Sequence, residues 1–212
     1  MSAKTKIILI VLVMSANVFP GNSQTSNGWR GEGRTGVYRE SSLLKVWPAG
    51  GPSLLWETSG AGAGFSSATV TDDAVYITGR KGDDDVLTAF KQDGKRKWET
   101  PYGKASQSNY PDSRCTPTVA GGKIFVVSGS GDMVCISTDG KVKWSVNYFE
   151  KYNASAPRFG ISESPIVVDN KVIGTPGGNM AAAVAFNVEN GNVIWTTPSV
   201  NEGTQYVNPL IV

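Results

Sequence analysis

Histidine is absent from this chain of 212 residues. Its absence excludes a His-dependent catalytic triad, a His-ligated zinc site and an imidazole general base within these residues. A large excess of charge of one sign is missing too, because the chain has 20 basic and 18 acidic side chains. A surface that binds nucleic acid needs a basic excess to displace the counterions of the phosphates. The sequence therefore predicts no nucleic-acid partner.

The chain also lacks an apolar run long enough to cross a bilayer, although it begins with a short one. Lys4 and Lys6 precede the apolar residues 7–14, and small or turn-forming residues follow. This order is typical of a secretory signal peptide. Cleavage is expected after Ser23, where no cysteine is present to carry a lipid. We therefore predict a signal peptide over residues 1–23, export to the periplasm or out of the cell, and no membrane span in the mature chain.

Tryptophan recurs in phase with tight turns. Four of the six tryptophans are separated by 42, 46 and 51 residues: Trp56, Trp98, Trp144 and Trp195. The last three each follow a two-residue turn signal: Asp93-Gly94, Asp139-Gly140 and Asn190-Gly191. Such pairs favour a type I′ hairpin because both central positions need a positive φ. Each of these tryptophans is therefore expected on a strand that leaves a hairpin, where it packs against the neighbouring unit.

A second marker recurs in the same phase as the tryptophans. It joins a polar residue, an Ala or Pro and two β-prone residues, at positions 67–70, 116–119, 164–167 and 208–211. After each of the first three copies come a turn, a second apolar strand and a third one. Four short strands joined by short turns describe one blade of a β-propeller.

The repeats therefore predict an all-β propeller of four-stranded blades. Three complete blades and the start of another are expected at about 66–100, 115–147, 164–198 and from 206. Residues 54–57 resemble an outer strand whose blade is missing, so the partial propeller is expected over 54–212, after an N-terminal extension at 24–53. Propellers have typically four to eight blades. The sequence contains only about three and a half blades, so we predict that it is the N-terminal part of a longer propeller.

The two cysteines fall within one predicted blade. Cys115 is placed on its first strand and Cys135 on its third. Two strand spacings separate them by about 9.6 Å, at about 4.8 Å per strand. A disulfide tolerates only about 7 Å between the Cα atoms. Two buried free thiols are predicted.

The tryptophan units resemble the pyrroloquinoline-quinone (PQQ) repeats of bacterial propellers in the quinoprotein alcohol dehydrogenase-like family. The similar stretches carry a small residue, an acidic residue, a glycine and a terminal tryptophan, at residues 89–98, 135–144 and 185–195. Three further stretches are similar to the exported, functionally undefined branch of the family: residues 29–36, 47–52 and 159–165. The resemblance covers roughly residues 29–212 and implies eight blades in the full-length protein.

The resemblance leaves two classes of function open. The first is a binding or scaffold module that recognises a protein or a carbohydrate, as does the peptide-binding scaffold of outer-membrane β-barrel assembly in the same family. The second is a PQQ-dependent alcohol or sugar dehydrogenase whose catalytic residues lie beyond Val212. Such dehydrogenases place a vicinal disulfide against the quinone and hold calcium with Glu, Asn and Asp, whereas Cys115 and Cys135 are not vicinal. PQQ with calcium is thus implied by the resemblance alone, and no catalytic residue or metal ligand is assigned.

Candidate ligand-binding residues lie in the loops before the innermost strands, which surround the mouth of a propeller channel. Arg114 precedes the second predicted blade, Glu163 precedes the third, and Arg158 lies on the same loop as Glu163. An arginine beside a carboxylate can hold an anionic or hydroxylated ligand through charge-assisted hydrogen bonds. The same residues can instead form an inter-blade ion pair without a ligand, and the sequence leaves both alternatives open.

Three adjacent carboxylates, Asp83, Asp84 and Asp85, fall in the turn between the second and third strands of the first blade. They lack the alternating spacing of a calcium-binding loop. A solvated, self-repelling turn is predicted here.

Overall fold

The computed structural model describes residues 28–38, 41–204, 206 and 208–211, and the regular structure of this part is almost entirely β. The predicted signal peptide lies outside the described residues. No helix in the described part is both long and apolar enough to cross a membrane.

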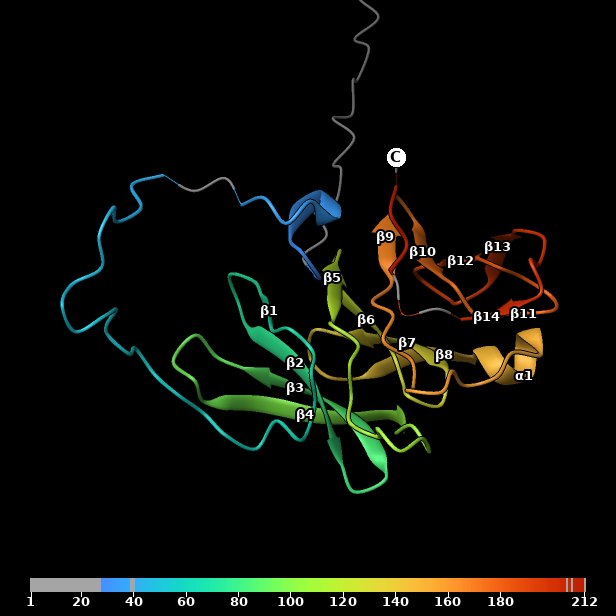
Figure 1. Cartoon of the computed structure of the whole chain (residues 1–212), viewed down its shortest axis with the longest axis horizontal. Coiled ribbons are helices and arrows are strands. Elements are labelled where there is room, and N and C mark those ends of the chain that lie inside the picture. The colour runs from blue at the N-terminus through green and yellow to red at the C-terminus, as the bar shows by residue number, and fades with distance from the viewer. Residues whose placement is uncertain (1–27, 39–40, 205, 207, 212) are drawn as a thin grey trace, which may run out of the picture.

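Three four-stranded antiparallel sheets follow one another along the chain (Figure 1). The first contains β1–β4, at Thr69–Val70, Val75–Lys81, Asp84–Phe90 and Arg96–Lys104. The second contains β5–β8, at Thr118–Ala120, Lys123–Val127, Asp132–Ser137 and Val142–Asn147. The third contains β9, β10, β12 and β13, at Ile166–Val168, Lys171–Gly174, Val184–Asn187 and Val193–Thr196.

In every sheet the strands pair in chain order, which is the meander of a propeller blade. The predicted all-β architecture of four-stranded blades is therefore confirmed. The remaining elements are short: a 3-10 helix η1 (Glu32–Arg34), a helix α1 (Tyr148–Tyr152) after β8, and a pair of two-residue strands, β11 (Gly177–Gly178) and β14 (Glu202–Gly203).

The repeat tryptophans connect each blade to the hairpin of the next. A Cβ on Gly140 would lie 2.9 Å from the ring of Trp98, and a Cβ on Gly191 would lie 2.8 Å from the ring of Trp144. Both glycines have positive φ, which the hairpin turn requires, and their missing Cβ leaves room for the tryptophan ring. The indole N–H groups of the two tryptophans donate to main-chain oxygens beside these turns, at 3.0 and 3.1 Å. The expected packing role is confirmed for Trp98 and Trp144.

The first and last tryptophans of the series differ from these two. Trp56 packs in the same way on Gly94, whose Cβ would lie 2.8 Å from its ring, but residues 54–57 form no strand. A strand needs a hydrogen-bonded neighbour, and no described strand pairs with this segment. Trp195, on β13, is 38% exposed, and no described hairpin covers it.

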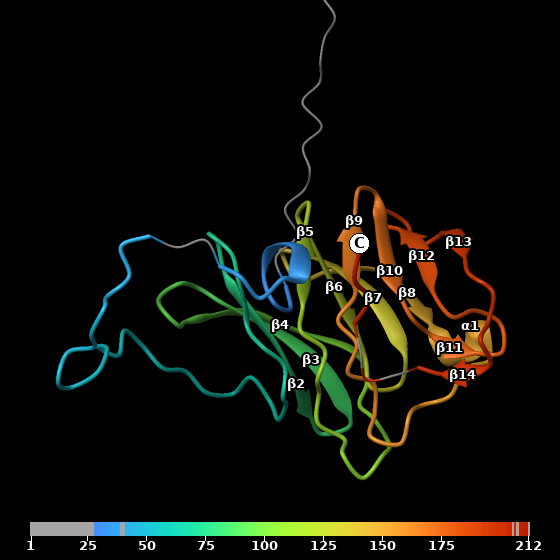
Figure 2. The same cartoon turned by 45° about the horizontal axis from the view of Figure 1, so that its top comes forward.

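A second set of contacts joins the innermost strands. In each bond, a backbone N–H donates to the side chain at the same marker position of the next blade. Ser67 donates to Thr116 Oγ1 at 3.1 Å, and Thr116 donates to Ser164 Oγ at 3.0 Å. Ser164 in turn donates to Asn208 Oδ1. The second sequence marker is therefore an inter-blade ladder around the propeller axis. Figure 2 shows β5 and β9, two of these innermost strands, next to each other.

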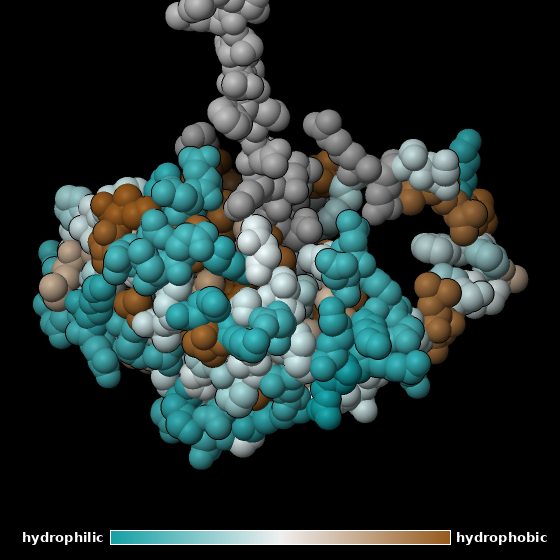
Figure 3. All heavy atoms as spheres, turned by 180° about the vertical axis from the view of Figure 1, so that it is seen from behind, coloured by the Kyte–Doolittle hydropathy of each residue, from teal (hydrophilic) through white to brown (hydrophobic). Residues whose placement is uncertain are grey.

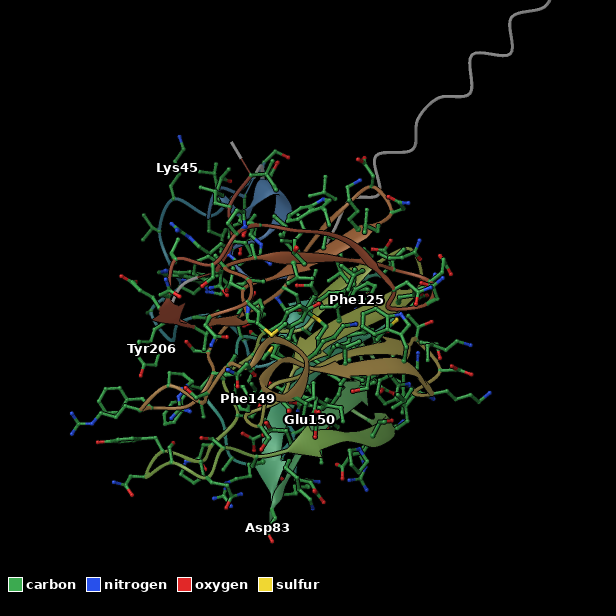
Figure 4. All side chains as sticks on the ribbon, turned by 90° about the vertical axis from the view of Figure 1, so that its right-hand side faces the viewer. Lys45, Asp83, Phe125, Phe149, Glu150 and Tyr206 are labelled. Atoms are coloured by element: carbon green, nitrogen blue, oxygen red, sulfur yellow. The ribbon has the colours of Figure 1, made fainter. Side chains whose placement is uncertain are left out.

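The core lies between the sheets. Its largest fully buried side chains are Tyr76, Tyr148, Phe125, Phe186, Leu87 and Ile124. Burying a large apolar side chain stabilises the fold by about 1.5–3 kcal/mol. Phe125 points into this interior, whereas Asp83 projects from the tip of the β2–β3 turn and Tyr206 points outward (Figure 4).

Both cysteines are buried and free. Cys115 lies just before β5, where its Sγ accepts a hydrogen bond from the backbone N–H of Val127 at 3.2 Å. Cys135 lies on β7, paired with Phe125. Burial raises the pKa of each thiol to about 12. Both side chains are therefore protonated packing residues.

The segment before the first blade stands away from the sheets. Its apolar side chains include Leu44, Val46 and Leu55, which are 69%, 81% and 90% exposed. Figure 3 shows apolar side chains along this projecting loop.

Candidate functional site

The loops that precede the innermost strands bring aromatic side chains together on one face. Tyr110 and Phe159 lie in edge-to-face contact with their ring centroids 5.2 Å apart, and Phe159 and Tyr206 are 5.8 Å apart. The backbone N–H of Phe159 donates to Tyr206 Oη at 3.0 Å. These three side chains, the aromatic row, are 52%, 40% and 46% exposed. The row thus offers flat apolar surface to a ligand.

The predicted residues Arg114 and Arg158 lie at this row. The guanidinium carbon of Arg158 is 5.2 Å from the ring centroid of Phe159, and that of Arg114 is 5.7 Å from the ring centroid of Phe65. A Cβ on Gly160 would lie 3.0 Å from Arg114 Nη1, so the two arginine-bearing loops touch. Stacking over aromatic rings keeps a guanidinium fixed while its edge stays available for an anion.

Neither arginine has a carboxylate partner within 4.0 Å among the described residues. Arg114 instead donates to the main-chain oxygen of Asp112 at 3.0 Å. Arg158 is exposed. The face therefore carries two guanidinium groups that form no direct ion pair with a described carboxylate.

Glu163, the third predicted site residue, does not join this face. Its side chain is completely buried, with Oε1 accepting from the backbone N–H of Thr175 at 2.8 Å. Its Oε2 has no hydrogen-bond partner. Burial raises the pKa of Glu163 to about 7, against the opposing effects of the Thr175 hydrogen bonds and the charge of Arg34. The cation that acts on Glu163 is thus Arg34 rather than Arg114.

The repeat explains why the structure separates Glu163 from Arg114. Glu163 stands two residues before Pro165, and Cys115 stands two residues before Pro117; both are buried. Arg114 stands one residue earlier and turns to the surface. Adjacent residues of extended backbone point in opposite directions, so neighbouring positions in this loop have opposite surroundings.

The three carboxylates of the β2–β3 turn also have different surroundings, and the prediction of a solvated turn is wrong for Asp85. Asp83 is at the exposed tip, and Asp84 pairs with Lys104 at 2.6 Å. Asp85 is only 1% exposed, and its Oδ2 accepts from the backbone N–H of Gly129 at 2.7 Å. Because β3 begins at Asp84, the next side chain faces inward.

Burial raises the pKa of Asp85 to about 6. The hydrogen bond from Gly129, one from Ser113 and the charges of Arg114 and Arg80 act in the opposite direction. Asp85 is therefore a buried carboxyl group on which the charge of Arg114 acts.

A small cleft of about 220 Å³ opens in the same group of loops. Its lining comprises Arg80, Gly82, Asp83, Ala105, Ser106, Gln107, Ser108 and Pro111. Ser106 links the cleft to Arg114, because a Cβ on Gly160 would meet both side chains. Polar groups that can orient a bound ligand thus lie beside the aromatic row.

Reasoning from the sequence missed the aromatic row, although a signal for it is present. Phe65 and Tyr206 each stand three residues before the Ala or Pro of the second marker, as Arg114 does. Tyr110 and Phe159 stand seven and six residues before theirs. Aligning the loops on the marker would therefore have grouped Tyr206 with Phe65 and Arg114. It would not have grouped Tyr110 with Phe159, because their offsets differ.

Within the described residues, the two cysteines do not form the vicinal disulfide that the resemblance associates with a quinone site. Within the described part of the chain, no three His, Cys, Asp or Glu side chains come together as a metal site. Cys115 and Cys135 are free and lie on different strands or loops.

Comparison with known proteins agrees with the repeat architecture. The family described as "Outer membrane protein assembly factor BamB", of the PQQ repeat type, matches residues 105–209. No curated protein sequence matches the chain significantly. Among solved structures, a europium-containing methanol dehydrogenase is similar with 21% identity and a TM-score of 0.52, over 69% of this chain and 27% of that one.

Two further structures are similar at lower scores. BamB from Moraxella catarrhalis has 19% identity and a TM-score of 0.46, over 68% of this chain and 42% of that one. The quinohemoprotein alcohol dehydrogenase ADHIIG from Pseudomonas putida HK5 has 23% identity and a TM-score of 0.48, over 66% and 21%. This chain thus spans less than half of the length of each of the three structures.

The blades and the repeated tryptophan contacts define a β-propeller fold of four-stranded blades. Residues 105–209, just under half of the chain, match the PQQ-repeat family described as "Outer membrane protein assembly factor BamB".

Proposed function

We propose that this chain is a binding or scaffold module of an exported PQQ-like propeller, acting in the periplasm or outside the cell, and that the loop face with the aromatic row is its recognition surface. The single observation that carries the proposal is the exposed contact of Phe159 with Tyr110, Tyr206 and Arg158. Aromatic and arginine side chains dominate the binding energy of protein interfaces. The basic start and short apolar run at residues 4–14 support export.

The charge of the face indicates the kind of ligand. Arg114 and Arg158 lack carboxylate partners, so a ligand that brings carboxylates gains charge-assisted hydrogen bonds. The aromatic row at the same time offers apolar surface for the body of that ligand. The matched family is described by a protein assembly factor, which supports a polypeptide rather than a carbohydrate. The proposed ligand is an acidic peptide segment that also carries aromatic or aliphatic side chains.

A peptide panel tests this function. Immobilised twelve-residue peptides of equal aromatic content are made in acidic, neutral and basic versions, with oligogalacturonate as an acidic carbohydrate, and binding of the 212-residue chain is measured. The acidic peptides are expected to bind best, and Arg158→Ala is expected to weaken that binding about tenfold, which corresponds to about 1.4 kcal/mol.

Lys141→Ala is the matched control, because it removes one exposed positive charge from the hairpin after β7, away from the inter-blade loops. It should leave the affinity unchanged. If the chain bound oligogalacturonate and none of the peptides, the ligand would be an acidic carbohydrate and not a peptide. Equal binding of all peptides, or equal loss in both variants, would overturn the assignment of the face.

A further inference from the structure

The third blade lacks a hydrogen-bond donor that the first two possess. On the innermost strands, Thr69 Oγ1 donates to the main-chain oxygen of Pro117 and Thr118 Oγ1 donates to that of Pro165, both at 2.6 Å. Ile166 occupies the same repeat position in the third blade. An isoleucine side chain cannot donate a hydrogen bond. The main-chain oxygen of Pro209, which is equivalent to those of Pro117 and Pro165, therefore accepts no side-chain hydrogen bond from the innermost strand of the third blade.

Arg34 supplies the missing donor from a distant part of the chain. Its Nη1 donates to the oxygen of Pro209 at 3.3 Å, and its Nη2 donates to the oxygen of Ser164 at 2.8 Å and to that of Pro165. One guanidinium thus binds three main-chain oxygens on two successive innermost segments. A planar fork of five N–H donors can reach several acceptors in this way, whereas an ammonium group presents its donors from a single point.

The surroundings of Arg34 suit a cation. Arg34 is 7% exposed, and its charge acts on the buried carboxyl group of Glu163, whose Oε2 has no hydrogen-bond partner. Burial lowers the pKa of Arg34 to about 10, and Glu163 opposes this effect. The guanidinium therefore remains charged at neutral pH. A buried charge is retained only where hydrogen bonds and an opposite charge compensate for lost hydration.

The backbone conformation of the N-terminal segment directs the Arg34 side chain toward the innermost strands. Arg34 ends η1 with a φ of 55°, a left-handed conformation that non-glycine residues adopt rarely. A Cβ on Gly28 would lie 3.0 Å from Thr118 Oγ1, so the segment also touches the second blade. Figures 1 and 2 show η1 at the end of the innermost strands opposite the β2–β3 turn.

We propose that the main-chain oxygens of Ser164, Pro165 and Pro209 form a guanidinium-binding site at the propeller axis. The nearby Glu163 carboxyl group acts on this site through its charge. Arg34 fills this site in the native chain. In doing so it fastens residues 28–36 across the innermost strands and replaces the threonine donor that the third blade lacks.

Chemical rescue tests the site. Arg34→Ala empties it, so the melting temperature of the full chain is expected to fall by several degrees. Ethylguanidinium chloride at low millimolar concentration is expected to raise the melting temperature of this variant in a saturable manner and to leave the wild type unchanged. Ethylammonium chloride at the same concentration should restore much less, because it lacks the planar fork.

Arg30→Ala is the matched control, since Arg30 lies in the same segment but is exposed over the ring of Trp29. It should change the melting temperature little and show no rescue. Ile166→Thr gives an independent readout: adding the hydroxyl donor should cost less stability in the Arg34→Ala background than in the wild type. If Arg34→Ala does not fold, the yield of refolding with ethylguanidinium is compared with that with ethylammonium.

A wild-type melting temperature for Arg34→Ala would overturn the proposal. So would equal effects of the two cations on the melting temperature or on the refolding yield. Equal costs of Ile166→Thr in the two backgrounds would contradict the role of Arg34 as the replacement donor.

Discussion

Trp144→Ala is expected to lower the free energy of unfolding by about 3 kcal/mol, the lower end of the range for removal of a large aromatic side chain from a packed site. Trp144 is partly buried, contacts Phe125 and Phe186 at centroid distances of 6.0 and 6.2 Å, and packs on Gly191 of the next blade. The substitution also leaves the main-chain oxygen of Val188 without its indole donor. Urea denaturation followed by far-UV circular dichroism measures the loss.

Trp195→Ala is the matched control, because it makes the same chemical change at the same repeat position. Trp195 has no described hairpin beneath it, and its neighbours Val193 and Ile194 are also exposed. Its removal should change the free energy of unfolding by less than about 0.5 kcal/mol. Equal losses in the two variants would show that the tryptophans act within their own blades and not between blades.

Gly129→Ala is expected to lower the free energy of unfolding by about 2–3 kcal/mol through overpacking. Gly129 lies between β6 and β7, and an added Cβ would stand 2.2 Å from the backbone nitrogen of Ser106 and 2.9 Å from the carbonyl carbon of Ala105. Its φ is not in the left-handed region, so the effect is steric alone. Because the obstacle is backbone rather than the end of a flexible side chain, the whole loop has to move.

The displaced loop also carries Tyr110, so the same variant should weaken binding at the aromatic row. Gly50→Ala is the control, since nothing lies within 4 Å of its added Cβ and its φ is ordinary. It should change stability by less than about 0.5 kcal/mol. A neutral result for Gly129→Ala would mean that the first two blades do not meet at this turn as closely as described.

The blade architecture follows from the sequence because its signals are local and repeated. A turn glycine followed by tryptophan needs only a few residues to be recognised, and three copies place the hairpins in register. The contact of Trp144 with the Asn190-Gly191 turn is a consequence of stacking identical units. The inner marker behaves likewise, since Thr116 and Ser164 accept from their neighbours in the same way.

The site was only partly predictable, for two physical reasons. The direction of a loop side chain depends on single-residue register, which separates the half-buried Arg114 from the fully buried Glu163. The cation whose charge acts on Glu163 is Arg34, which lies about 130 residues earlier in the chain. No local pattern links residues at such a distance. The buried position of Asp85 depends in the same way on where β3 begins.

The most direct test of the account measures the affinity of the best acidic peptide for the wild type and for two single variants by calorimetry. Phe159→Ala removes the centre of the aromatic row, and Val142→Ala removes an apolar side chain of β8 that is 48% exposed away from the row. The account predicts a loss of about tenfold or more for Phe159→Ala, which is about 1.4 kcal/mol, and no change for Val142→Ala. Unchanged affinity for Phe159→Ala, with or without a loss for Val142→Ala, would contradict the loop face as the binding surface.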